Sequence, residues 1–509
     1  MRIVINIQGK GSRFYSALPR SWFSVPSNNV VTRINGAYSV GTVQMEPVTG
    51  SGPASSTVRV SVIGDRKAEH SLAGAASRLA LLVPWAMKGS VAMADQGLIS
   101  GSNFIIAILL ARWLSPEQYG AYAIAFAIYL LLLMLYQSLL LEPMAVFGSS
   151  VYRGCVREYL KAMLWLHLLI AAGMFCTFGA AAAIALKAGQ AGGLPGAYIG
   201  LAAAGPMILL LGLARRVFYL ELSPVPAACG SLIYCTVTLG GLYVAYYRHW
   251  LSPLSALLMM GLGGLVSSAL LFIYLKSRLP SSGASPSLRE TFLRHWEYGR
   301  WALAGYAMMW IPANIFYPLV GSLAGIAKAG QLKALMNLPS PLLQTYAALS
   351  PLLLPYAVRV LERKGTAGAD SLMRWVGLFS ISSALVYWAV LLLFSGPVFR
   401  LLYSGKYQEV IPLLPVAALA SISNCAFFGP ALVLRAMKSP VTVFTAVCVS
   451  VCISLAIGVP ATRALGVKGA AWSIAASELI GFVMAFILLR RKLRKPLPDL
   501  AESETQVTA

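Results

Sequence analysis

Twelve separate apolar stretches, each close to twenty residues long, constrain this chain more than any other feature. About twenty apolar residues in a helix cross the roughly 30 Å hydrocarbon layer of a bilayer, and backbone groups in lipid must hydrogen-bond within their own helix. Only 11% of the 509 residues are charged, whereas a soluble domain carries roughly 25%. We therefore predict an all-α integral membrane protein of about twelve transmembrane helices. The predicted spans are Ser90–Leu114, Ala121–Leu141, Tyr159–Leu186, Gly196–Ala214, Ala227–Tyr247, Pro253–Leu275, Trp301–Leu323, Leu332–Val358, Leu372–Phe394, Val410–Leu434, Val441–Val459 and Gly469–Leu489.

Residues 1–88 differ from the rest because they are polar and contain no apolar run long enough to span a bilayer. Neither a secretory signal nor its cleavage site is recognisable there. Three interpretations remain open: a disordered tail, upstream sequence included through a wrong start codon, and a small accessory domain. Met87 or Met93 is the alternative start. Within this segment, Ala73–Trp85 is compatible with a short helix at the membrane surface.

The distribution of lysine and arginine predicts the orientation. If the chain before the first span is cytoplasmic, twenty-one basic residues flank the helices on that side and nine lie on the outer side. Positive loops favour the cytoplasm, so we expect both termini inside, in the cell (inner) membrane. The same bias, together with ten basic residues in the first 88, accounts for the net charge of +23. Nucleic-acid binding is therefore not expected.

The chain repeats itself at a spacing of about 210 residues. Ser223 and the proline after it recur at Ser439, 216 residues later, and Asn103 has a counterpart in Asn314 at a separation of 211. The segments 114–120 and 323–330 and the basic ends of the sixth and twelfth spans match at similar spacings. These landmarks predict two pseudo-repeated six-helix bundles with a ligand site between them. The predicted organisation is an N-terminal segment 1–88, a first bundle 89–280, a cytoplasmic linker 281–297, a second bundle 298–490 and a cytoplasmic tail 491–509.

Several stretches resemble a known family. They are DQGLISGSN at residues 95–103, LARWLSPEQYG at 110–120, GQLKALMNLPSP at 330–341 and YSGKY at 403–407. They resemble polysaccharide exporters of the MOP (multidrug/oligosaccharidyl-lipid/polysaccharide) superfamily, namely Wzx-type O-antigen and exopolysaccharide flippases. The resemblance covers roughly residues 90–495. It implies a MATE-like fold of two six-helix bundles, a cationic central cavity, and alternating access for a polyprenyl-pyrophosphate-linked oligosaccharide.

A diphosphate head group requires cations, and arginine suits it because its planar guanidinium bonds two oxygens at once. Candidate substrate-binding cations lie at the ends of predicted spans, where each alternatively sets topology by reaching the lipid head groups. These candidates are Lys88, Arg112, Arg215, Arg216, Arg300 and Arg435.

Polar residues within spans provide the second set of candidates. Glu478 lies near the middle of the last span, with small residues on its helix face. It is either a coupling site for H⁺ or Na⁺ or a hydrogen-bonded structural carboxylate. Asn103, Asn314 and Asn424 are the polar candidates for the space between the bundles, although amides also join helices. Prolines around the seventh and eighth spans predict that those helices are broken and mobile.

Catalytic signals are not recognisable. The four histidines are dispersed, the seven cysteines form no Cys-x-x-Cys pair, and no phosphate-binding loop is present, so we expect no enzyme activity, no cofactor and no metal site. The expected partners are a lipid-linked oligosaccharide, a coupling H⁺ or Na⁺, membrane lipids and other polysaccharide-assembly proteins. Two alternatives remain: a multidrug or organic-cation antiporter of the same superfamily, and a membrane glycosyltransferase or polymerase that uses lipid-linked sugars. The short outer loops disfavour the second alternative.

Overall fold

The computed structural model describes residues 29–34, 37–42, 66–190, 193–276 and 286–494. The chain divides into two units, one ending at Ala86 and one beginning at Met87. In the first unit, β1 (Asn29–Ile34) and β2 (Ala37–Thr42) pair as an antiparallel hairpin, which the sequence did not predict. The stretch predicted as a short surface helix belongs instead to the long helix α1 (Arg66–Trp113). The remaining residues of the predicted N-terminal segment lie outside the described ranges.

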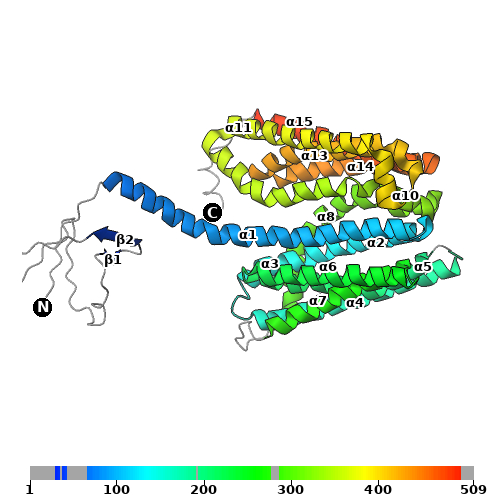
Figure 1. The fold of residues 1–509 in the computed structure, drawn as a ribbon, viewed down its shortest axis with the longest axis horizontal. Helices are drawn as coiled ribbons and strands as arrows, with labels where there is room; N and C mark the ends of the chain where they lie inside the picture. The colour runs from blue at the N-terminus through cyan, green and yellow to red at the C-terminus, as the bar shows by residue number, and fades with distance from the viewer. Residues whose placement is uncertain (1–28, 35–36, 43–65, 191–192, 277–285, 495–509) are drawn as a thin grey trace, which may run out of the picture. The chain divides into compact units, whose positions relative to one another are not determined.

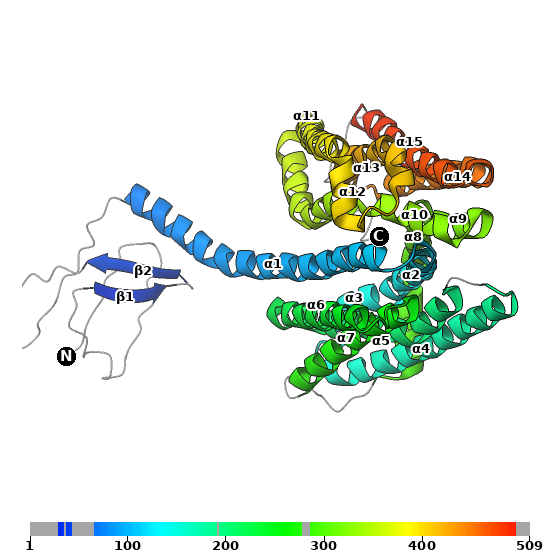
Figure 2. The same cartoon turned by 45° about the vertical axis from the view of Figure 1, so that its right-hand side comes forward.

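The second unit is helical throughout its described part and consists of two bundles (Figure 1). In the first bundle α5 packs on both α4 and α7, and α6 packs on α7. In the second bundle α13 packs on both α11 and α15, and α14 packs on α15 (Figure 2). The elements after α1 are α2 (Pro116–Tyr136), the π-helix η2 (Gln137–Leu141), α3 (Glu142–Ser149), α4 (Val156–Lys187), α5 (Leu194–Leu220), α6 (Pro224–Tyr247), α7 (Pro253–Leu275), α8 (Leu288–Asn314), α9 (Phe316–Ala324), α10 (Ile326–Asn337), α11 (Ser340–Leu393), α12 (Ser395–Tyr403), the short 3₁₀ helix η3 (Gln408–Leu413), α13 (Leu414–Ala436), α14 (Pro440–Leu465) and α15 (Val467–Leu493).

The number of membrane-spanning segments agrees with the sequence prediction of about twelve. Ten helices in the described residues are long and apolar enough to cross a bilayer, and α8 with α9 makes an eleventh span bent by 44°. Helix α11 has 54 residues, which at 1.5 Å per residue is about 80 Å, more than twice the hydrocarbon thickness. It divides at Gly365, whose φ of 58° and ψ of −150° are not helical. Its two parts correspond to the predicted eighth and ninth spans.

The seventh and eighth spans are broken near their prolines, as predicted. The seventh span breaks between α8 and α9, two residues after Pro312, and the eighth breaks between α10 and α11 at Pro339. A proline lacks the N–H that would bond to the preceding turn. The linker predicted at 281–297 is helical from Leu288 onward, while residues 277–285 lie outside the described ranges.

The two bundles share local conformations at repeat-related positions. Helices α6 and α14 begin in the same way, with Ser223 and Ser439 before a proline at φ values of −118° and −121°. The residues just before them, Leu222 and Lys438, both have positive φ, 51° and 53°. Positive φ is uncommon outside glycine, so its recurrence 216 residues apart supports the internal repeat.

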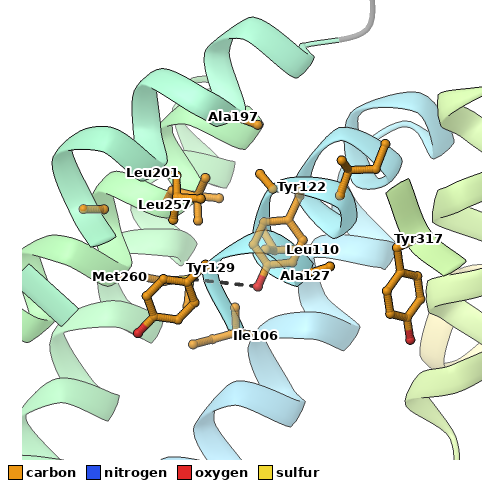
Figure 3. Packing of buried hydrophobic residues seen from close by; sticks show 14 of the residues in the cluster. Ile106, Leu110, Tyr122, Ala127, Tyr129, Ala197, Leu201, Leu257, Met260 and Tyr317 are labelled. Atoms are coloured by element: carbon orange, nitrogen blue, oxygen red, sulfur yellow. Dashed lines mark hydrogen bonds between the residues drawn. The ribbon is translucent and has the colours of Figure 1, made fainter. Parts of the chain in front are cut away.

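The buried core of the first bundle centres on aromatic residues of α2. Tyr122 and Tyr129 point toward Leu201 of α5 and Met260 of α7, and Tyr317 of α9 lies on the other side of α2 (Figure 3). The Tyr122 hydroxyl contacts the Met260 sulfur at 4.0 Å. Helix α2 therefore lies between the core of its own bundle and the second bundle, and its side chains help to line the junction.

Candidate functional site between the two bundles

Helices α2 and α10 cross with their backbones in contact. A Cβ atom built on Gly120 would lie 1.8 Å from the carbonyl oxygen of Ile326, and one built on Gly330 would lie 2.5 Å from the carbonyl oxygen of Pro116. Neither distance is compatible with a side chain larger than hydrogen. Two turns along α10 from Gly330, the buried amide of Asn337 donates to the Tyr119 hydroxyl at 2.7 Å. The crossing is thus closely packed and hydrogen-bonded.

Two cations join the bundles at the end where α1 finishes and α2 begins, which the charge distribution predicts to be the outer end. Arg112 donates from Nη1 to the carbonyl oxygen of Leu401 in α12 at 2.7 Å. In return, Lys406 Nζ donates to the carbonyl oxygens of Arg112 and Leu114 at 2.8 and 2.7 Å. These groups close the outer end around the crossing of α2 and α10. Arg112, predicted to bind substrate, therefore has a structural contact between the bundles.

At the opposite, inner end, α8 packs along the first bundle. Tyr306 donates to the Glu142 carboxylate at 2.5 Å, and Trp310 Nε1 donates to the carbonyl oxygen of Ala127 at 2.8 Å. Glu142 also interacts electrostatically with Arg216. Helices α8 and α5 therefore bring polar groups to this carboxylate.

The π-helix η2 receives a buried histidine from α8. One ring nitrogen of His295, Nδ1, lies 3.0 Å from the carbonyl oxygen of Leu139, and the other, Nε2, lies 2.6 Å from the Tyr159 hydroxyl of α4. A π-helical turn changes the i→i−4 ladder and leaves carbonyl groups for other donors. Burial lowers the pKa of His295 to about 4, so the ring is neutral at physiological pH. His295 thus links α2, α4 and α8.

Asp95 of α1 is neutralised within the first bundle. It is fully buried, and its Oδ2 accepts from Arg215 of α5 at 2.7 Å. Tyr219 and Ser231 also donate to its carboxylate. Arg215 lies 120 residues after Asp95 in the sequence. Arg215, a predicted substrate cation, is therefore engaged by a buried carboxylate.

Lys333 of α10 was missed as a site residue because it was counted with the outer loops. The structure places it within a helix, one turn after Gly330, with Nζ 5.1 Å from the ring centre of Tyr317 and 5.9 Å from that of Phe126. In the described part of the chain it forms no ion pair with a carboxylate. The missed signal was its position three residues after Gly330, the repeat partner of Gly120.

Two candidates meet in the second bundle. Asn424 of α13 donates from Nδ2 to Glu478 Oε2 of α15 at 2.8 Å. The carboxylate is only partly exposed, and it forms no salt bridge with any cation in the described residues. A carboxylate held by one amide in an apolar bundle can accept a proton or, with further oxygen ligands, a monovalent cation.

The other candidates are not brought into one cluster. Lys88 and Arg300 are exposed near the inner end, and exposed Arg435 donates to the Ser350 hydroxyl at 3.3 Å. Asn314 is buried at the end of α8 and bonds weakly to Trp310 of its own helix at 3.5 Å. Asn103 is half-buried in α1.

Comparison with known proteins identifies the fold. No protein-family model matches the chain, and no curated protein matches it in sequence. Among solved structures, an inward-facing multidrug resistance MATE family transporter of the MOP superfamily is similar with a TM-score of 0.66 and 14% identity, over 78% of this chain and 94% of that one. The chain has the MATE fold.

Two further structures show how far this similarity extends. An outward-facing multidrug resistance MATE family transporter of the same superfamily has a TM-score of 0.56 at 14% identity, over 80% of this chain and 94% of that one. A MOP superfamily transporter from Pyrococcus furiosus also has a TM-score of 0.56 at 14% identity, over 80% of this chain and 95% of that one. That transporter is described as having a binding pocket of reverse polarity, which suggests a different function. At such identities the MATE fold is shared, and the substrate must be argued from this chain's own residues.

Proposed function

We propose that this protein moves an anionic, lipid-linked substrate across the cell membrane by alternating access, and that the substrate is a polyprenyl-pyrophosphate-linked oligosaccharide. The observation that carries the proposal is the position of Lys333. This cation lies between aromatic rings, on a helix at the junction of the bundles, and pairs with no carboxylate in the described residues. A charge removed from water needs a counter-ion. A phosphate group supplies it.

The partners of the acidic residues near the junction also indicate a positive charge at the proposed site. Asp95 is neutralised by Arg215, and Glu142 accepts from Tyr306 and lies close to Arg216. Among the described residues, Lys333 is then a charge at the junction that no carboxylate pairs, and it is positive. A positive site attracts a diphosphate and repels an organic cation.

The geometry of the junction supports a state in which the outer end is closed. The outer end is closed by Gly120, Gly330, Arg112 and Lys406. The similarity in fold is also higher for the inward-facing MATE structure than for the outward-facing one, with TM-scores of 0.66 and 0.56. In this state a head group would enter from the cytoplasmic leaflet and reach Lys333 one turn inside the closed crossing.

Glu478 with Asn424 is the proposed site of ion coupling. Protonation or Na⁺ binding at this carboxylate would change the charge inside the second bundle, where α13 and α15 pack together. Such a change alters the relative stability of two packed arrangements. We also propose that both chain ends are cytoplasmic, because the side of the membrane on which they lie carries more basic residues.

The second candidate is a multidrug or organic-cation antiporter, favoured by one observation: the similar solved structures include multidrug resistance MATE transporters. Deletion of the gene in its own host separates the two functions. We expect lipid-linked repeat units to accumulate on the cytoplasmic leaflet and surface polysaccharide to fall, with restoration by the native chain but not by Lys333→Gln. Unchanged polysaccharide with greater sensitivity to cationic drugs would support the antiporter instead.

A further inference from the structure

The inner ends of α4 and α7 form a cavity of about 330 Å³ that is open to the surface and that the transport mechanism does not use. It lies on the first bundle, away from the crossing of α2 and α10. Its walls are almost entirely apolar and come from Leu160 and Leu164 of α4 and from Phe272 and Leu275 of α7. A cavity of this kind holds hydrocarbon rather than water, since a water molecule needs polar partners.

Three cations surround the mouth of this cavity. Arg157 and Lys161 belong to the first turns of α4, and Lys276 follows the last residue of α7. All three side chains are exposed, and none of them forms a salt bridge within the described ranges. Their charges therefore face the solvent or the head-group layer at the end of the cavity. An anion held there would interact with up to three cations at once.

The same helix face continues with groups suited to the edge of a bilayer. Trp165 lies one turn beyond Lys161 on α4 and is 61% exposed. On α7, Ile273 and Tyr274 are also exposed. Tryptophan and tyrosine are enriched at the level of the head groups, so the order along α4 is cation, cation, aromatic ring and then aliphatic side chains. This order follows the change from head group to acyl chain in one lipid leaflet.

We propose that this cavity, between α4 and α7, is a binding site for an anionic phospholipid of the cytoplasmic leaflet. The phosphate lies among Arg157, Lys161 and Lys276, and one acyl chain enters the apolar cavity. Basic pockets between transmembrane helices on the cytoplasmic side bind anionic lipid head groups in this way. The charge complementarity favours an anionic lipid over phosphatidylcholine, whose head group carries no net charge.

The test uses the full chain purified in a non-ionic detergent and titrated with phosphatidylglycerol, with bound lipid counted by native mass spectrometry and the melting temperature recorded. We expect phosphatidylglycerol to bind and raise the melting temperature, and the variant R157Q/K161Q/K276Q to bind it at least tenfold more weakly. The matched control R359Q/R363Q/K364Q removes three exposed charges near the bend of α11 and should bind like the native chain. Leu164→Trp fills the cavity without changing a charge and should also weaken binding.

Two further arms separate the lipid from other ligands. Glycerol 3-phosphate, which carries the phosphate without acyl chains, should neither compete nor stabilise, and phosphatidylcholine should bind at least tenfold more weakly than phosphatidylglycerol. Equal binding of the two lipids, effective competition by glycerol 3-phosphate, or native-like binding by Leu164→Trp would overturn the proposal. If the triple variant does not fold, Leu164→Trp and the two ligand arms still decide it.

Discussion

Gly120 and Gly330 are separated by 210 residues of sequence and lie backbone to backbone where α2 crosses α10. A Cβ on Gly330 would lie 2.9 Å from the Gly120 nitrogen and 3.2 Å from its Cα. The two glycines are repeat partners, so the internal two-fold relation of the bundles passes close to this contact.

The first prediction concerns this crossing. Gly120→Val places two methyl groups against the backbone of α10, which cannot move away as a flexible side chain would, and overpacking of this kind costs about 1–3 kcal/mol. We expect the outer end to open. In a chain whose native cysteines are replaced, labelling of Lys333→Cys by a membrane-impermeant maleimide added outside the cell should rise severalfold.

Gly173→Val is the control, because a Cβ on this α4 glycine meets no atom within 4 Å. It should leave labelling unchanged. Equal labelling in the Gly120 variant and in the native background would show that the crossing does not close the outer end.

The second prediction concerns Lys333. A charged hydrogen bond to a phosphate contributes about 1.5–3 kcal/mol, which corresponds to roughly tenfold to a hundredfold in affinity. Lys333→Gln should therefore reduce transport of a fluorescent polyprenyl diphosphate in proteoliposomes by that factor, and Lys333→Arg should retain most of it. Lys328→Gln is the control, since Lys328 pairs with Glu409 outside the crossing. Similar activities for all three variants would contradict a role in substrate binding.

The sequence predicted the architecture well because the bilayer imposes a length and a composition on each span. The repeat was also visible: Ser223 and Ser439 begin helices with the same local conformation, and Gly120 and Gly330 meet at the crossing of α2 and α10. Pairing of charges was not predictable in the same way. Asp95 and Arg215 are 120 residues apart, and Glu142 and Tyr306 are 164 residues apart, so only packing of helices brings them together.

The candidate site residues were predicted from residue type and from depth within a span. This explains why several candidates have other contacts in the structure and why Lys333 was missed. Arg112, Arg215 and Arg435 have contacts inside the protein, whereas Lys333 was overlooked because the boundary of the eighth span was placed too close to it. Helix boundaries are the least certain part of a prediction from sequence. A shift of one helical turn decides whether a cation is assigned to the lipid head groups or to the junction of the two bundles. Glu478 lies within α15, a helix long and apolar enough to cross a bilayer, and its partner Asn424 is 54 residues away in the sequence.

The third prediction separates structure from transport at Asp95 and Arg215. Removing one partner leaves the other charge buried, which costs about 3–5 kcal/mol. Arg215→Met alone should therefore lower the melting temperature and the amount of protein in the membrane, and Asp95→Asn combined with Arg215→Met should recover part of both losses. Arg363→Gln, at an exposed position, should change neither. A stable Arg215→Met protein with lost transport would instead return Arg215 to the substrate site.

The fourth prediction concerns acid sensitivity at His295. Its pKa is about 4 in the folded protein and about 6.5 in an unfolded chain, so the unfolded state binds more protons between these values. The free energy of unfolding should therefore decrease as pH falls from 6.5 to 4, by up to about 3 kcal/mol from this residue. His295→Gln should show a smaller fall in melting temperature between pH 7.5 and 5. The exposed His249→Gln should keep the native slope, and an unchanged slope in the His295 variant would exclude this origin.

The last prediction tests whether Glu478 couples transport to an ion. Glutamine has nearly the same shape as glutamate and can still accept a hydrogen bond from Asn424, so Glu478→Gln should preserve packing of α13 on α15 and the abundance of the protein. It cannot lose or gain a proton, and it offers a cation no charge. In proteoliposomes, we expect imposed H⁺ or Na⁺ gradients to accelerate transport by the native chain and to have no effect on Glu478→Gln, whose basal rate equals that of the native chain without a gradient. Asn424→Ala, which removes the amide and keeps the carboxylate, should retain the response to the gradient. A Glu478→Gln protein that is scarce in the membrane but responds to the gradient would identify the carboxylate as a structural group that hydrogen-bonds two helices.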